Sequence, residues 1–244
     1  MGETHRLLFN KFNIYQEHLL VVTKELEPQN GRLTKEDFRQ TILAFKAVRG
    51  MFFFNSGPKA GASQHHRHLQ VFPSEAREMP IFKTLLEYAR ELKYRQQEKI
   101  ANPLSLEIEI FRFPAFRFRH GLVLIGSESS IDSTFESDGE NRKEGLDEGQ
   151  KLKESTHLAY LRLYKELIER SEEGEKREYN LIGCEHFLLL VPRKKGKAFN
   201  EISVNAVGFM GEVLFKDAQL MRRYMEEGRQ GHHILEDITF RQHK

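Results

Sequence analysis

Three polar residues at alternate positions, His66, His68 and Gln70, follow a loop rich in small residues. Successive side chains of a β-strand point to opposite faces, so these three would share one face of a strand. A neutral imidazole can attack phosphorus when an acceptor holds its second ring nitrogen. The pattern therefore predicts nucleotidyl transfer through a histidine transiently bonded to phosphorus, with His66 donating a hydrogen bond that orients the phosphate or the nucleophile.

The loop before this strand offers hydrogen-bond donors for phosphate oxygens. Backbone N–H groups and short polar side chains in a glycine-containing loop bind oxyanions, although such a turn is also common at a hairpin tip. We expect five residues of the loop to bind the α-phosphate and ribose of a nucleotide: Asn55, Gly57, Gly61, Ser63 and Gln64.

Residues 55–70 read Asn-x-Gly, a small-residue loop, Ser-Gln and then His-x-His-x-Gln. This order resembles the diadenosine tetraphosphate phosphorylases, or ATP adenylyltransferases, of the histidine-triad superfamily, and more distantly galactose-1-phosphate uridylyltransferase. Residues 10–22 resemble the first hairpin of the phosphorylases, and residues 202–216 resemble their C-terminal segment. The resemblance implies an α+β, histidine-triad-like fold of two fused αβ halves, with an antiparallel sheet and flanking helices.

The resemblance also assigns roles to single residues. It makes His68, the middle histidine of the motif, the nucleophile, and Lys11 a polyphosphate contact. Asn205 and Lys216 would contact the nucleotide from the second half, and Lys59 is either a further polyphosphate contact or a solvated surface residue. Because the family's phosphorylases carry additional residues before the first hairpin, part of the nucleobase pocket is expected to be absent or rebuilt.

Gln70 favours transfer to an anion over hydrolysis. A histidine at this position could protonate a leaving group and assist attack by water, whereas an amide can act as neither acid nor base. With the resemblance, this predicts that inorganic phosphate cleaves diadenosine tetraphosphate to ADP and ATP. Sulfate or a sugar phosphate as acceptor, and a nucleotide-binding module without turnover, remain open.

The rival chemistry is a metal-dependent hydrolase. His66 and His68 on one strand could ligate a metal, and His120 or the pair His232 and His233 could complete the set. The glycine loop would then have no use, so we expect no metal site and no covalently bound cofactor. Mg²⁺ is expected only as counter-charge on the polyphosphate.

Composition excludes several other classes. The 244 residues carry 38 Lys and Arg against 36 Asp and Glu, which argues against nucleic acid as a partner. The single cysteine, Cys184, indicates a reducing compartment, and no apolar run is long enough to span a membrane. The sequence thus predicts a soluble cytoplasmic enzyme with a small-molecule nucleotide substrate, and it leaves the oligomeric state open.

The two ends of the chain echo each other. Residues 11–22 and 179–191 both place Glu-His between apolar runs, and an Asn-led, Gly-containing segment follows each of them. We therefore expect a duplication within one compact domain, with the His-x-His-x-Gln strand in the first copy alone. Its parts are a catalytic half over 1–126, a mobile insertion over 127–153 and a degenerate second half over 154–244.

Local patterns predict the elements around the site. Thr34 followed by Asp37 three residues later indicates the start of a helix. Expected helices cover 35–49, 80–101, 155–172 and 208–227, and expected strands cover 104–113 and 116–125.

Overall fold

The structure is a computed structural model, and it describes residues 2–99, 108–125, 146–170 and 177–242. Within these residues, seven strands form one sheet in the order β1-β2-β4-β3-β6-β7-β5, and every neighbouring pair is antiparallel. The strands are β1 (His5–Phe9), β2 (Leu19–Thr23), β3 (Met51–Asn55), β4 (His68–Phe72), β5 (Gly121–Leu124), β6 (Glu178–Gly183) and β7 (Phe187–Arg193). A separate pair consists of β8 (Lys197–Ala198) and β9 (Ile202–Ser203).

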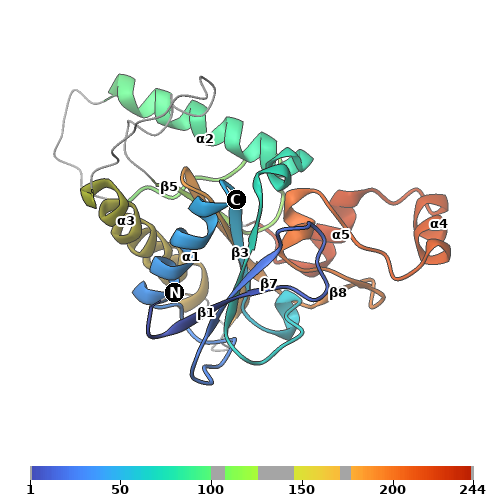
Figure 1. The fold of residues 1–244 in the computed structure, drawn as a ribbon. Helices are drawn as coiled ribbons and strands as arrows, with labels where there is room; N and C mark the ends of the chain where they lie inside the picture. Colours follow the sequence, from blue (N-terminus) through green and yellow to red (C-terminus); the bar gives the residue numbers. More distant parts are fainter. Residues whose placement is uncertain (1, 100–107, 126–145, 171–176, 243–244) are drawn as a thin grey trace.

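Helices cover both faces of the sheet (Figure 1). The α-helices are α1 (Lys35–Ala47), α2 (Pro80–Lys99), α3 (Leu146–Tyr164), α4 (Ala218–Glu226) and α5 (Gly231–Ile238). A π-helical turn, Lys165–Glu169, continues α3, and short 3-10 turns cover Pro58–Ala60, Ser74–Glu78 and Ala206–Met210. Helices α1 and α3 pack on one face, α2 and the 206–210 turn lie on the other, and α4 stands at the periphery (Figure 1).

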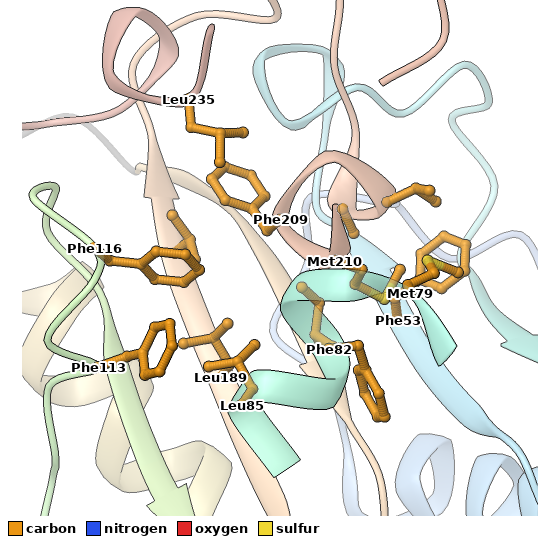
Figure 2. Packing of buried hydrophobic residues seen from close by; sticks show 14 of the residues in the cluster. Phe53, Met79, Phe82, Leu85, Phe113, Phe116, Leu189, Phe209, Met210 and Leu235 are labelled. Carbon is orange, nitrogen blue, oxygen red and sulfur yellow. The ribbon is translucent and has the colours of Figure 1, made fainter. Parts of the chain in front are cut away.

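Strand β3 shows why the sheet has two cores. Its residues Met51–Asn55 are all buried, which is the pattern of a strand covered on both faces. Phe52 and Phe54 pack into the core beneath α1 and α3, while Phe53 packs into the opposite core beneath α2. Phe82 and Leu85 of α2 belong to this same core, part of which Figure 2 shows.

Two of the expected helix starts are confirmed. Thr34 caps α1 in a capping box, because the Asp37 N–H donates to its hydroxyl at 3.1 Å and its own N–H donates to the Asp37 carboxylate at 2.7 Å. Helix α2 begins at Pro80, whose missing N–H costs nothing in the first turn. As the sequence predicts, the loop of small residues leads into β4 and helix α2 follows it.

Other expected boundaries are wrong. Helix α3 begins at Leu146, nine residues before the expected helix start at 155, and the segment 126–145 lies outside the described residues. Of the predicted 104–113 and 116–125 strands, 104–107 is not described and only Gly121–Leu124 forms a strand. Phe111 adds an isolated bridge to Leu122, because the phenylalanines between them turn into the core instead of continuing a ladder.

The predicted helices over 155–172 and 208–227 also differ. The first is regular only to Tyr164 and then widens into the π-helical turn. The second is a 3-10 turn that ends at Gly211, whose φ is 114°, followed by α4, for which Asp217 is the N-cap. The glycine and the new cap together explain the break.

The predicted halves share one sheet. Strands β1–β2 and β6–β7 are both hairpins, and His18 and His186 immediately precede the second strand of each, in keeping with the echo in the sequence. Strand β5, which belongs to residues 1–126, pairs with β7 at the far edge of the sheet. The boundaries at 126 and 154 remain predictions. Among the described helices, none is both long and apolar enough to cross a membrane.

Candidate active site

His68 begins β4 on the expected face of the sheet. It is half-buried, as is Gln70, while Leu69 and Val71 between and after them are fully buried beneath α1 and α3. The Nδ1–H of His68 donates to the backbone carbonyl of His66 at 2.9 Å. In that tautomer Nε2 carries the lone pair, and no other described residue forms a hydrogen bond with it.

The electrostatics keep His68 neutral. Burial lowers the pKa of His68 below its ordinary value of 6.5, and the positive charge that His66 can carry lowers it further. The hydrogen bond to the His66 carbonyl works in the opposite direction, and the pKa is lowered overall. A neutral imidazole with an accessible Nε2 is the form that can attack phosphorus.

His66 acts on His68 through its backbone. Its imidazole Nε2 instead lies 3.0 Å from the Thr23 hydroxyl and 2.9 Å from the Glu25 carbonyl, at the end of β2. The sequence predicted an orienting hydrogen bond donated by the side chain of His66. In the structure, the backbone carbonyl of His66 orients the His68 ring by accepting its Nδ1–H.

Gln29 is a positioning residue that the sequence analysis missed. Its buried amide Oε1 accepts the His68 N–H at 2.8 Å, and its Nε2 donates to the carbonyls of Asn55 and His68 at 2.8 and 3.2 Å. The amide thereby satisfies the backbone where β3 and β4 part, so β4 is fixed at its first residue, His68. No local motif signals this contact, because the partners are 26 and 39 residues away.

The opposite face of β4 is tied to α1. Arg67, 5% exposed, donates to the Asp37 carboxylate at 3.4 Å, and His5 lies 2.9 Å from the same carboxylate. Burial works to raise the pKa of Asp37, but the hydrogen bonds from His5 and Thr34 and the charge of Arg67 hold it below its ordinary value. The Asp37 carboxylate therefore stays charged and forms an ion pair with Arg67, the residue that precedes His68.

The loop before β4 is folded around a carboxylate. The backbone N–H groups of Lys59 and Ala60 donate to the side chain of Glu178, and a Cβ on Gly57 would lie 2.5 Å from its carboxyl carbon. Gly61, with φ of 83°, ends the turn, and a Cβ there would lie 2.6 Å from the Val204 carbonyl oxygen. Gly61 is therefore required by its backbone conformation and by close packing, and at Gly57 an added Cβ would displace the Glu178 carboxyl group that the loop binds. The side chains of Ser63 and Gln64 are exposed.

Asn55 builds the loop as an acceptor. Its side-chain oxygen accepts from the amide of Asn180 at 2.7 Å and from the Ala206 N–H at 3.0 Å, and the residue is 2% exposed. We expected it to donate to a nucleotide. Its oxygen joins β3 to β6 and to the 206–210 turn, and donation to a nucleotide by its NH₂ group stays a prediction.

Residues predicted to bind the nucleotide from elsewhere lie in three places. Lys11 is exposed beside the ring of Phe12, and Lys216 is exposed before α4. Asn205 caps the 206–210 turn, with its side chain accepting the Val207 N–H at 2.9 Å.

The first hairpin contributes His18 and Asn10 to the site. His18 Nε2 lies 2.9 Å from the Oε1 of Gln70, and Asn10 Nδ2 lies 3.2 Å from each ring nitrogen of His18. Tyr15 of the same hairpin donates to Glu212, which follows the 206–210 turn, at 3.3 Å. The Glu17-His18 echo in the sequence signalled the hairpin but gave His18 no role.

The third histidines considered for a metal site are placed differently. Both ring nitrogens of His120 are engaged by backbone, at 2.7 Å from the Phe113 N–H and 2.7 Å from the Phe118 carbonyl. His232 and His233 lie in the first turn of α5, with ring centroids 4.0 Å apart. Across the described ranges, no group of three His, Cys, Asp or Glu side chains is arranged to hold a metal ion.

Two family models match the chain in succession. The Ap4A (diadenosine tetraphosphate) phosphorylase N-terminal domain matches residues 1–87. The ATP adenylyltransferase C-terminal domain matches residues 115–241, which is more than half of the chain.

Two curated proteins of Saccharomyces cerevisiae are similar along nearly the whole chain. Protein APA1 is 26% identical over 262 residues, covering 98% of this chain and 70% of that protein. Diadenosine 5',5'''-P1,P4-tetraphosphate phosphorylase 2 is 25% identical over 243 residues, covering 91% of this chain and 66% of that protein. The chain thus spans between 66% and 70% of the length of these relatives.

A solved structure shares the fold. Yeast Ap4A phosphorylase Apa2 in complex with Ap4A aligns with a TM-score of 0.64 at 20% identity, over 100% of this chain and 76% of that chain. This likeness confirms the α+β, histidine-triad-like architecture that the motif implied.

Proposed function

Because the chain belongs to the ATP adenylyltransferase family, we propose that it cleaves Ap4A with inorganic phosphate and releases ADP and ATP. The observation that carries the proposal is the state of His68, which is neutral, donates Nδ1–H to the His66 carbonyl and leaves Nε2 as the nucleophile. The name of the second yeast relative and the Ap4A bound in the solved structure supply the substrate.

In the first half-reaction, His68 Nε2 attacks the α-phosphorus of Ap4A. A nitrogen–phosphorus bond forms, the bond from that phosphorus to its bridging oxygen breaks, and ATP leaves. The ring becomes an adenylyl-imidazolium that keeps its Nδ1–H. The His66 carbonyl, 2.9 Å from Nδ1, is placed to stabilise this charge as it develops.

In the second half-reaction, an oxygen of inorganic phosphate attacks the same phosphorus. The nitrogen–phosphorus bond breaks, ADP leaves, and His68 returns to the neutral form with its lone pair on Nε2. Gln70 can donate to a phosphoryl oxygen but cannot remove a proton from water. The intermediate therefore waits for an acceptor that is already an anion.

The remaining predicted contacts belong to this proposal. Ser63 and Gln64 are exposed at the end of the loop that leads into β4, and Lys11 is exposed in the tip of the β1–β2 hairpin, toward the opposite end of β4. These groups are suited to the ribose and the polyphosphate, while Asn205 and Lys216 would close the site from the second half. Mg²⁺ would enter with the polyphosphate as its counter-ion.

A cytoplasmic location and a nucleotide as the partner, with no nucleic acid, are part of the same proposal. The single cysteine, Cys184, is buried, and a chain with one cysteine forms no disulfide within itself, which suits a reducing compartment.

The test mixes the purified protein with Ap4A, with and without phosphate, and follows the products by chromatography. Equal amounts of ADP and ATP, formed only with phosphate, are the expected result. ATP and AMP formed without phosphate would make the protein a hydrolase. Turnover only with sulfate or a sugar phosphate would identify another acceptor, and nucleotide binding without turnover would identify a binding module.

A further inference from the structure

His18 is buried against the catalytic face of the sheet. It is 3% exposed and packs edge-on against Phe72, with ring centroids 4.6 Å apart. Its Nε2 lies 2.9 Å from Oε1 of Gln70. Gln70 is the residue proposed to favour transfer over hydrolysis. The hydrogen bond that the buried His18 forms with it therefore calls for an explanation.

The contact is the third step of a chain of hydrogen bonds whose direction is fixed at its start. The backbone N–H of Phe12 donates to Asn10 Oδ1 at 3.1 Å. A backbone N–H can only donate, so the Asn10 oxygen must face it and the amide nitrogen must face His18. That nitrogen lies 3.2 Å from both ring nitrogens of His18.

This series of hydrogen bonds determines the tautomer of His18. Among the described residues Nδ1 meets only the Asn10 donor, so a hydrogen there would have no acceptor, whereas Nε2 also meets the Gln70 amide. Nε2 carries the hydrogen and donates it to Oε1 of Gln70. Burial lowers the pKa of His18, and the nearby His68 lowers it further, although the hydrogen bond to Gln70 works to raise it. His18 is therefore neutral and in a single tautomer near pH 7.

The last step is the orientation of Gln70. With its oxygen engaged by His18, the amide has only its NH₂ group left to offer, and no described residue hydrogen-bonds to that group. If the amide were reversed, its oxygen would face the anionic oxygens of a bound phosphoryl group and repel them.

We propose that His18 is a positioning residue that holds the Gln70 amide with its NH₂ toward the reacting phosphoryl group. The assignment rests on the proposed function for the substrate, but the hydrogen-bond chain exists in the free protein. The backbone of Phe12 sets the direction, and Asn10 and His18 transmit it to Gln70. His18 and His68 thus have opposite tautomers on the same face of the sheet.

The first test needs no substrate. In protein labelled with ¹⁵N-histidine, the ring nitrogen shifts and couplings report which nitrogen carries the hydrogen at pH 7.5. The expected result is Nε2–H for His18 and Nδ1–H for His68. An Nδ1–H tautomer or an imidazolium at His18 would overturn the proposal, whether or not the protein turns over Ap4A.

The second test is a double-mutant cycle on phosphorolysis. His18→Phe keeps the aromatic packing and removes the donor, and should lower kcat about 10-fold with little change in KM. Gln70→Leu should lower kcat about 100-fold, as expected when a phosphoryl donor is lost. The double variant should be no slower than Gln70→Leu alone, because His18 acts only through Gln70.

Two further variants separate positioning from packing. Tyr15→Phe is the matched control, because Tyr15 packs on the same Phe72, with centroids 5.0 Å apart, and its hydroxyl contacts Glu212 instead of Gln70. It should change kcat less than 2-fold, and His18→Gln, which keeps an N–H donor, should recover most of the rate lost in His18→Phe. Effects of His18→Phe and Gln70→Leu that multiply, or equal losses in Tyr15→Phe and His18→Phe, would overturn the proposal.

Discussion

The Nδ1–H of His68 donates to the backbone carbonyl of His66 at 2.9 Å, so one residue of the motif sets the tautomer of the other. The bond uses the main chain of His66 and not its imidazole ring. That ring is held apart, by Thr23 and Glu25. The ring of the proposed nucleophile is therefore oriented by the main chain that precedes β4.

The pH profile should show a neutral nucleophile. Burial lowers the pKa of His68 below 6.5, and only the unprotonated ring can attack, so kcat/KM for Ap4A should be level from pH 7 to 8. It should decline only in more acidic solution, with an apparent pKa below 6.5. Steady-state rates across that range are the measurement, and an acid limb centred at or above 6.5 would contradict the assignment.

Gln70→His should shift the reaction toward water. An imidazole at this position can remove a proton from water, which the amide cannot do. The ratio of AMP to ADP formed from Ap4A at fixed phosphate should rise in the variant. Gln70→Asn provides the control, since it keeps an amide, and its ratio should stay near that of the wild type. An unchanged ratio in Gln70→His would remove the link between Gln70 and transfer.

Stability should decrease as solutions become acidic, partly through His120. Burial, with the charge of Arg112, lowers its pKa to about 4, and its Nε2 accepts the Phe113 N–H. In the unfolded chain His120 binds a proton below pH 6.5, whereas in the folded chain it binds one only at about pH 4. Acid therefore favours unfolding between these two pH values.

From pH 7 to pH 5, this single group should cost about 2 kcal/mol of unfolding free energy. Urea unfolding of the wild type and of His120→Gln at both pH values measures it. The variant should lose about 2 kcal/mol less than the wild type over the same interval. Equal losses would show that His120 does not titrate between the two states.

Gly61→Ala should destabilise the protein and disorder the loop. Gly61 has φ of 83°, and a Cβ would lie 2.6 Å from the Val204 carbonyl oxygen. Strain and clash together should cost at least about 2 kcal/mol in urea unfolding. Gly231→Ala is the matched control, since nothing lies within 4 Å of the added Cβ. It should change stability by less than about 0.5 kcal/mol, and equal effects would refute the packing argument.

The sequence predicted what short-range patterns determine. Alternation placed His68 and Gln70 on one face of β4, and the Thr34 and Asp37 spacing located the start of α1. Glycines at 57 and 61 correctly marked a loop, although their reason is close packing against Glu178 and Val204. Such features depend on a few neighbouring residues, so a single amino-acid sequence is enough to predict them.

The missed features depend on contacts between distant segments. Gln29 meets His68 across 39 residues, and His18 meets Gln70 across 52. Asn55 accepts from Asn180 and Ala206, which lie more than 120 residues away. No spacing rule connects such positions, so the direction of these hydrogen bonds required the structure.

The central claim is that His68 carries the adenylyl group. Protein incubated with Ap4A in the absence of phosphate, and weighed intact, should gain the mass of one adenylyl group, located on His68 by fragmentation at neutral pH. Addition of phosphate should remove the mass and release one equivalent of ADP, and His68→Ala should gain no mass while remaining folded. Adenylyl transfer to another residue, or phosphorolysis by His68→Ala at more than about 1% of the wild-type rate, would contradict the account.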